Sequence, residues 1–312
     1  MCFTITVLGS SSALPTSTRF TTAQVLNVHE RFFLIDCGEG TQIQLRRASV
    51  NISRINHIFI SHLHGDHVFG LFGLFSSYNL IGRKTDLHVY AHQNLSVSID
   101  HFKTHFSGEM YYNIIFHAIP TSSATVLYAD KNITVESFPL RHSIPVAGFL
   151  FREKQKLLNI KKEMISRYDL GIRDIRSIKE GGDYTTISGE VIKNRELTLP
   201  PYKPRSYAFC TDTRAFTKLY DVLRDVDLLY FETTFAEKDK KLAKETGHST
   251  AVQAATVAVK SNAGKLLMGH FSTRYKNTDQ LLKEAREIFP CSYAVNDFES
   301  YSIAKRQLLS VE

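Results

Sequence analysis

The sequence predicts an α/β fold in which sheets and helices pack in layers. Short runs of alternating apolar and polar residues dominate the first third of the chain, a pattern typical of strands. Later, such runs alternate with segments whose apolar residues recur at helical spacing. With 43% hydrophobic and 22% charged side chains, the 312 residues can bury one large core or two modest ones. Disorder is therefore excluded.

Each expected element is bounded by turn residues such as Gly, Ser and Asn. Strands are expected at residues 3–8, 23–28, 31–36, 56–61, 113–119, 133–140, 206–211, 227–231 and 265–270. Helices are expected at residues 67–80, 95–106, 216–224, 250–261 and 279–288. The succession of strand and helix in the second half favours α/β layering.

Neither a membrane segment nor an export signal is expected. The longest apolar run, residues 68–75, is broken by two glycines and is far shorter than the ~20 residues that span a bilayer. The first residues enter a strand pattern without a basic region or cleavage site, so we predict a cytoplasmic protein. The four cysteines have no Cys-x-x-Cys spacing, which argues against a disulfide framework and a thiolate metal cage.

Positive charge is concentrated in one part of the chain. The overall charge is +7, a mild excess that is common in proteins that bind no polyanion. Between Arg152 and Arg205, however, 13 basic residues face 8 acidic ones, a net charge of +5. Within this stretch, residues 154–204 are charged throughout, contain four glycines and end in a proline-rich run. We expect them to form an insertion outside the main core.

The strongest local signal is the segment Ser-His-Leu-His-Gly-Asp-His after the strand that ends near residue 61. In an extended exit from a strand, His62 and His64 point the same way and can share one metal ion. The turn at Gly65 directs Asp66 and His67 towards a second ion. Imidazoles and a carboxylate without thiolate suit Zn²⁺, with Mn²⁺ or Fe as alternatives. A surface loop with histidines would explain one such residue, but not four within six positions.

Further ligands for two metal ions are expected at strand ends, where a sheet can fix them. His142 follows the expected strand 133–140, Asp212 follows 206–211, and His270 closes 265–270. Each residue alone would be an ordinary turn or capping residue. Their shared placement makes them candidate ligands.

These motifs resemble the metallo-β-lactamase superfamily and, within it, the ribonuclease Z family, whose members mature the 3′ ends of tRNA. The matching segments are LGSSSALPT from Leu8, DCGEGTQ from Asp36, SHLHGDHVFGL from Ser61, TDTR from Thr211, FETTF from Phe231, GHST from Gly247 and GHF from Gly269. The histidine-rich segment alone indicates only the superfamily, whereas DCGEGTQ, FETTF and GHST together indicate ribonuclease Z.

The resemblance implies a fold and a metal centre. The fold is a four-layer αβ/βα sandwich, a single domain over residues 1–312, with residues 154–204 inserted as an arm. By this resemblance the centre would hold two Zn²⁺ per subunit. His62, His64 and His142 would hold one ion, Asp66, His67 and His270 the other, and Asp212 would bridge them. Two such ions can share a hydroxide that attacks the phosphodiester.

The resemblance also implies the reaction and its catalytic residues. Precursor tRNA would be cut on the 3′ side of the discriminator base region, leaving a 3′-hydroxyl on the tRNA. Asp66 would orient the attacking water or accept its proton, and His248 would act as general acid with Glu232 as its orienting carboxylate. Asp36 and Glu39 are candidates for residues that hold the ligand histidines in the tautomer that binds metal.

The insertion departs from the family pattern. The arm of ribonuclease Z clamps tRNA and carries a Gly-Pro element and a Lys-Gly element, but Gly-Pro is missing here. Only Lys179, followed by Gly181 and Gly182, faintly resembles the tip. Arg173, Arg176 and Lys179 are the candidate RNA-binding residues, and a solvated surface insertion is the alternative. The resemblance further implies a homodimer, and neither DNA nor a membrane is expected as a partner.

Two other functions are open to this sequence. One is a hydrolase of the same fold that acts on small phosphodiesters, thioesters or sulfate esters. The other is an RNA-binding protein without activity, which would have lost metal ligands, yet none is missing. Glu232, His248 and the basic insertion favour the nuclease. His64 argues against the oxidoreductase branch of the fold, which usually has Glu there.

Overall fold

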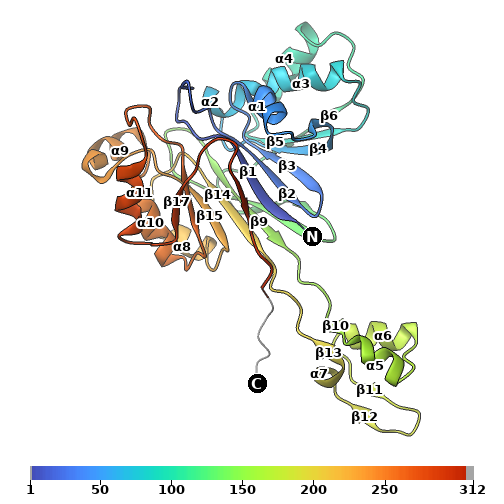
Figure 1. Cartoon of the computed structure of the whole chain (residues 1–312). Coiled ribbons are helices and arrows are strands. Elements are labelled where there is room, and N and C mark those ends of the chain that lie inside the picture. Colours follow the sequence, from blue (N-terminus) through green and yellow to red (C-terminus); the bar gives the residue numbers. More distant parts are fainter. Residues whose placement is uncertain (1, 307–312) are drawn as a thin grey trace. The chain divides into compact units, whose positions relative to one another are not determined.

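The computed structural model describes residues 2–306 and shows two compact units. The larger unit comprises the chain up to Arg152 together with Ser206–Ile303. The smaller unit comprises Glu153–Arg205 and, within the described chain, residues 304–306. Figure 1 labels the elements of both units.

The first sheet of the larger unit has seven strands in the order β18-β1-β2-β3-β4-β5-β6 (Figure 1). Their bounds are β1 Phe3–Gly9, β2 Ala23–Val28, β3 Arg31–Ile35, β4 Ile55–Phe59, β5 Leu87–Ala91, β6 Ile114–Ala118 and β18 Ser300–Ser302. Strands β3 to β6 run parallel. The loops that follow β3 and β4 therefore leave the sheet at the same edge.

The second sheet also has seven strands, in the order β17-β16-β15-β14-β9-β8-β7. Their bounds are β7 Thr125–Ala129, β8 Ile133–Pro139, β9 Ala147–Glu153, β14 Ser206–Cys210, β15 Leu228–Glu232, β16 Leu266–Gly269 and β17 Ser292–Ala294. Strands β14 to β17 are parallel, which brings the carboxyl ends of β14, β15 and β16 side by side. Such an edge is where open α/β sheets bind ligands.

Helices cover the outer faces of the two sheets (Figure 1). Those linked to the first sheet are α1 Thr41–Arg47, η1 Ile52–Arg54, α2 Gly65–Val68, α3 Gly70–Leu80 and α4 Leu95–His105. Those linked to the second sheet are α8 Lys218–Val222, η2 Glu237–Asp239, α9 Lys240–Thr246, α10 Ala251–Lys260 and α11 Asp279–Arg286. Among the described residues, none of the helices is long and apolar enough to cross a membrane.

Strand β3 shows how the sequence builds these layers. Phe33 and Ile35 belong to the cluster between the two sheets, while Leu34 belongs to the cluster under the first sheet's helices. Phe33 packs against Phe151 of β9, with ring centroids 5.7 Å apart. Because both faces are covered, the strand is apolar from Phe32 to Ile35. The order helix, sheet, sheet, helix confirms the predicted α/β layering.

Five strands of the two large sheets were not among those expected from the sequence. They are β5, β7, β9, β17 and β18. In β9, residues 147–151 are all buried, so apolar residues follow one another instead of alternating. Strand β18 has three residues and is defined by pairing with β1, a contact between the two ends of the chain.

The smaller unit contains β10 Asn159–Ile160, α5 Lys162–Arg167, α6 Ile172–Lys179, β11 Tyr184–Thr185, β12 Val191–Ile192, α7 Asn194–Leu197 and β13 Thr198–Leu199. Strands β10 and β13 pair, as do β11 and β12. Four buried side chains form its core: Leu170, Ile178, Ile192 and Leu197. The unit therefore has an apolar interior of its own, separate from the two large sheets.

Candidate active site

The segment after β4 supplies four polar side chains within residues 62–67. Buried Ile60 ends the apolar run, and the chain then passes through His62 and His64 before α2 begins at Gly65. Atom Nε2 of His62 lies 3.0 Å from Nδ1 of His64. Asp66 and His67 lie in the first turn of α2, where atom Nε2 of His67 is 3.3 Å from Oδ2 of Asp66.

The second sheet supplies its polar side chains one at a time, from the ends of different strands. His142 follows β8, Asp212 follows β14, and His270 follows β16. Asp212 and His270 have φ angles of 44° and 58°, a left-handed conformation that L residues adopt at a cost of roughly 1–2 kcal/mol. These turns direct both side chains to the strand ends, as expected where strain is tied to function.

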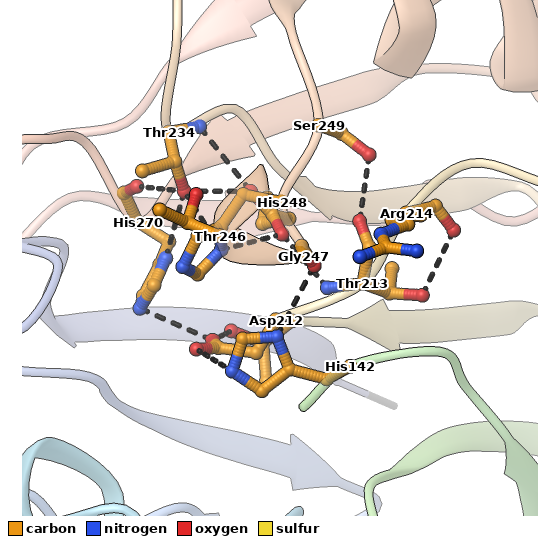
Figure 2. Close-up of polar contacts among 12 residues, drawn as sticks. His142, Asp212, Thr213, Arg214, Thr234, Thr246, Gly247, His248, Ser249 and His270 are labelled. Atoms are coloured by element: carbon orange, nitrogen blue, oxygen red, sulfur yellow. Dashed lines mark hydrogen bonds and ion pairs between the residues drawn. The ribbon is translucent and has the colours of Figure 1, made fainter. Parts of the chain in front are cut away.

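Asp212 lies at the centre of the assembled cluster, and Figure 2 shows it next to His142 and in contact with His270. Its Oδ2 lies 3.6 Å from Nε2 of His62 and 3.7 Å from Nε2 of His142. Its Oδ1 lies 3.2 Å from Nε2 of His67 and 3.1 Å from Nε2 of His270. One carboxylate thus presents a different oxygen to each of two ligand groups. The first group is His62, His64, His142 and Asp212, and the second is Asp66, His67 and His270.

The donor atoms of this cluster fit metal ions. Within residues 2–306, the Nε2 atoms of His67 and His270 are buried and have no hydrogen-bond partner. The other ring nitrogen of each is engaged, because Nδ1 of His67 lies 2.7 Å from Asp36 Oδ2 and Nδ1 of His270 lies 3.0 Å from Thr234 Oγ1. Hydrogen bonds at Nδ1 leave Nε2 as the free lone pair, the tautomer that a metal ligand requires.

His142 is oriented in the same way by the backbone. Its Nδ1 lies 3.1 Å from the carbonyl oxygen of Gly247, an acceptor that receives the ring N–H (Figure 2). Gly247 has a φ angle of 81°, and a Cβ added there would lie 2.9 Å from this ring nitrogen. A glycine therefore permits both the turn before His248 and the close approach of His142.

Asp36 supports two histidines at once. Its carboxylate accepts hydrogen bonds from the backbone N–H of Ser61, at 2.7 Å, and from the Ser61 hydroxyl, at 2.9 Å. The Ser61 hydroxyl also lies 3.0 Å from Nδ1 of His62. Asp36 thus contacts His67 directly and His62 through Ser61, so one buried carboxylate orients a residue of each ligand group.

Burial and neighbouring groups set the protonation states of His62 and Asp212. Burial lowers the pKa of His62, and the neighbouring His67 lowers it further. The neutral ring that results is the form that binds a metal. For Asp212, burial alone would raise the pKa, but the neighbouring imidazoles of His270 and His67 outweigh it and hold the carboxyl pKa well below its usual range. The cluster thus combines a neutral imidazole with an ionised carboxylate.

His248 lies beside the cluster and is paired with a buried carboxylate. Its Nδ1 is 2.9 Å from Oε1 of Glu232, the last residue of β15. Burial would lower the pKa of His248, but the Glu232 charge outweighs it and raises the pKa to about 9. Glu232 in turn accepts hydrogen bonds from Thr213 N–H and the Thr234 hydroxyl. The imidazole is therefore protonated at neutral pH.

The start of α10 fixes His248 in place. Thr250 caps this helix, accepting a hydrogen bond from Gln253 N–H, while the Gln253 side chain accepts one from Thr250 N–H. This reciprocal capping box sets the helix start at Ala251, three residues after His248. The GHST segment thus forms a turn followed by the cap of α10, and this local structure holds the imidazole of His248.

The ligand groups line a cavity of about 550 Å³. Its polar lining includes His64, Asp66, His142, Asp212, His248 and His270. A larger cavity of about 740 Å³ lies between α3 and α4 but is mainly apolar, and it contains none of these residues. The chemistry belongs to the first cavity.

One sequence-predicted residue of the larger unit, Glu39, makes no hydrogen bond to a ligand histidine in the described chain. It lines the cavity, but its side chain is exposed. Its neighbour Gly40 has a φ angle of 82°, which begins α1. Arg173, Arg176 and Lys179 lie on α6 of the smaller unit.

Three supporting contacts were missed by sequence reasoning. Ser61 links Asp36 to His62, and Thr234 links Glu232 to His270. The backbone N–H of Ala13 donates to Asp66 Oδ2 at 2.9 Å. Ser61 and Thr234 occur inside the SHLHGDH and FETTF segments, so their position was a signal. A backbone donor such as that of Ala13 leaves no signal in side-chain chemistry.

Fold and site together define a metallohydrolase of the metallo-β-lactamase fold. The metallo-β-lactamase fold protein YhfI from Bacillus subtilis is similar in structure, with a TM-score of 0.69, 16% identity and coverage of 97% of this chain and all of that chain. The amino-terminal half, residues 3–158, also falls within the family described as "Anti-Pycsar protein Apyc1".

Over its whole length the chain belongs to the ribonuclease Z family. It is 46% identical to ribonuclease Z of Bacteroides fragilis strain YCH46 over 288 residues, which cover 92% of this chain and 95% of that protein. It is 41% identical to ribonuclease Z of Porphyromonas gingivalis strain W83, covering 95% and 97%. The human short-form tRNase Z structure has a TM-score of 0.71 at 26% identity, covering 96% and 99%.

Proposed function

We propose that this protein is a metal-dependent endoribonuclease that removes the 3′ trailer of precursor tRNA. Membership in the ribonuclease Z family supports the reaction and the substrate. The observation that carries the proposal is the His248–Glu232 pair beside the cluster centred on Asp212. A charged imidazole there can protonate a leaving oxygen, which a poor leaving group such as a ribose 3′-oxygen requires.

The proposal includes two divalent ions, Zn²⁺ first, with Mn²⁺ or Fe as alternatives. The ligands are those of the two groups defined above, and Asp212 is the bridge. Bound ions would polarise the phosphodiester and lower the pKa of a water molecule. The Nε2 atoms of His67 and His270 support this assignment, since a buried nitrogen lone pair without a hydrogen-bond partner is costly unless a cation accepts it.

The reaction assigns separate tasks to the side chains. Asp66, held by Ala13 N–H, orients the attacking water and accepts its proton. As the bond between phosphorus and the 3′-oxygen breaks, His248 donates the proton of its Nε2 to that oxygen. Glu232 keeps His248 charged and fixes its ring through Nδ1. The tRNA then ends in a 3′-hydroxyl, and the trailer carries the phosphate.

The geometry also permits a different role for His248. Asp212, His248 and His270 offer atoms close enough together to hold an ion. The Glu232 contact opposes this role, because a protonated imidazole has no lone pair to give. The metal content of His248→Ala therefore separates an acid from a ligand, as set out in the Discussion.

The proposal assigns RNA binding to residues 154–204. Arg173 and Arg176 of α6 are both exposed. Arg176 also forms an ion pair with Glu180, with Nε 3.1 Å from Oε1. Lys179 is half-buried at the end of the same helix. An exposed ion pair of this kind is weak and can exchange its carboxylate for a phosphate. A homodimer, in which one subunit's arm serves RNA at the other's site, belongs to the same proposal.

Cleavage of one unmodified precursor tRNA tests the reaction. The purified chain should release the trailer in one cut, and end mapping should find a 3′-hydroxyl on the tRNA. A chelator should abolish cleavage, and added Zn²⁺ or Mn²⁺ should restore it. Cleavage that persists without metal, or cuts at scattered positions, would contradict the proposal.

Replacement of residues 165–183 with a short Gly/Ser linker tests the arm. Affinity for precursor tRNA should fall, and each lost phosphate contact should flatten the slope of log K against log salt by roughly 0.7–0.9. Hydrolysis of bis(p-nitrophenyl) phosphate should change little. Unchanged tRNA affinity and salt slope would make the segment a solvated surface insertion.

A further inference from the structure

Phe69 presents a large aromatic ring to solvent at the junction of α2 and α3. Its side chain is 68% exposed, whereas its neighbours Val68 and Leu71 are buried in the core under the first sheet. A single exposed apolar residue needs no explanation by itself. The location of Phe69 does, because its ring lines the cavity that contains the metal-ligand groups.

The Phe69 ring is held against the ligand loop. A Cβ placed on Gly65 would lie 2.4, 2.7 and 2.9 Å from three of the ring's carbon atoms, so only glycine lets the ring approach this closely. Phe69 N–H also donates to the Gly65 carbonyl at 2.9 Å. Gly65 separates His64 from Asp66, and the ring therefore lies directly on the segment that joins the two ligand groups.

A second exposed apolar side chain lines the same cavity. Leu14 is 64% exposed and stands on the loop after β1, next to Pro15. This loop is fixed at the site by two contacts, Ala13 N–H to Asp66 and the Ser11 hydroxyl to the Leu14 carbonyl at 2.6 Å. The cavity thus combines a polar cluster with two exposed apolar groups, each anchored close to a ligand residue.

We propose that Phe69, together with Leu14, forms a nucleobase-binding subsite next to the scissile phosphate. The inference rests on the proposed function. A phosphodiester placed at the ligand groups has one nucleoside on either side, and its bases have flat apolar faces. Aromatic rings bind such faces by stacking and do so for every base, because each has a π face. The subsite therefore positions the substrate without requiring a particular sequence.

The contact between Phe69 and a nucleobase is tested by a double-mutant cycle, in which a substitution in the protein is combined with a change in the substrate. Phe69→Ala should lower kcat/KM for unmodified precursor tRNA by roughly 10-fold, within the range known for base stacking on aromatic side chains. Phe69→Tyr, which keeps the ring, should restore most of the rate. The second change is an abasic nucleotide, placed either at the last tRNA position or at the first trailer position.

Coupling between the two changes identifies the stacked base. On the substrate that lacks this base, Phe69→Ala should cost less than 2-fold, because the partner of the ring is already gone. Phe106→Ala is the matched control: that phenylalanine is 70% exposed on the protein surface but lines the other cavity. It should cleave every substrate as the unchanged protein does.

Each other outcome overturns the subsite. These outcomes are wild-type kcat/KM in Phe69→Ala, an equal loss on intact and both abasic substrates, and a loss accompanied by lower metal content. An altered molecular mass in solution, with equal losses on all substrates, would assign the ring to a subunit interface instead. If the unchanged protein does not cleave precursor tRNA at all, the proposed function fails first, and that result is read before any variant is compared.

Discussion

The two sheets contribute to the same site in different ways. The first sheet delivers His62, His64, Asp66 and His67 from one continuous loop, backed by Asp36. The second sheet delivers His142, Asp212 and His270 from three separate strand ends. The first half is a local structure whose spacing is written in the sequence. The second half exists only after β8, β14 and β16 are aligned in one sheet.

The difference shows where each half is vulnerable. Within the loop, one continuous segment sets the relative positions of the four side chains. Among the strand ends, each residue has a task that no neighbour can take over. Asp212 is the extreme case, because its two oxygens face different ligand groups. The following variants test this contrast, from the largest expected effect to the smallest.

Asp212→Ala should have the largest effect. Without the shared carboxylate the separation of the two groups is no longer set, so metal should be lost and cleavage of precursor tRNA should fall by about 10³-fold or more. Metal analysis of the purified variant, together with cleavage rates, measures both. Asp225→Ala is the control, since Asp225 also has a left-handed backbone, with φ of 58°, but lies outside the cluster. Two tightly bound ions and near-normal cleavage in Asp212→Ala would show that the bridge is assigned wrongly.

His248→Ala should separate catalysis from metal binding. Two ions should remain, while cleavage falls by roughly 10²- to 10⁴-fold, the range for a positioned acid–base group. A substrate with a good leaving group should recover much of the rate, because it needs no proton. His105→Ala, a change at an exposed histidine of α4, should leave both readouts unchanged. Loss of metal from His248→Ala would make this histidine a ligand.

Asp36→Asn should weaken both ligand groups by an intermediate amount. The amide can still accept from Ser61, but its NH₂ group opposes the N–H of His67, so the ring loses its support. Metal affinity should fall roughly 10- to 100-fold. Competition with a chelator measures this, and Asp130→Asn, a carboxylate that accepts backbone N–H groups in a distant turn, is the control. An affinity equal to that of the unchanged protein would remove Asp36 from the site.

Glu232→Gln should shift the alkaline limit of the pH–rate profile. Its effect on the cleavage rate should be smaller than that of the variants above. The pKa of His248 is raised to about 9, so the protonated acid is present below that pH and is lost as the pH rises through it. Cleavage should decline above about pH 9 in the unchanged protein. In Glu232→Gln the raising charge is gone, and the decline should begin at lower pH. A pH–rate profile with the same alkaline limit in both proteins would contradict the pairing.

Much of the fold was predictable where local sequence carries the structure. The strand near residues 3–8 alternates at its start, because Phe3, Ile5 and Val7 enter the cluster between the sheets while Thr4 and Thr6 are less buried. Strand β9 does not alternate, since Ala147 through Phe151 are buried on both sides. Strand β18 is fixed by pairing with β1, almost 300 residues away. Such elements depend on contacts that no window of sequence contains.

The site shows the same division. The spacing of the histidine loop indicated metal chemistry, and the strand-end positions of Asp212 and His270 indicated further ligands. Asp36 and Glu39 are three residues apart and looked equivalent. The left-handed turn at Asp36, with φ of 56°, directs its carboxylate to His67, whereas Glu39 is exposed. Sequence spacing alone could not distinguish the two residues, because a backbone turn sets the direction of each side chain.

The division of the cluster between two sheets has a consequence for how the protein matures. Ser61 and Ala147 join the two halves through a backbone hydrogen bond of 3.0 Å, and the ligands on either side are distant in sequence. A complete set of ligands therefore forms only when both sheets have docked. A ligand that binds only the native state stabilises it, so metal bound at this cluster would stabilise only those chains whose sheets have docked.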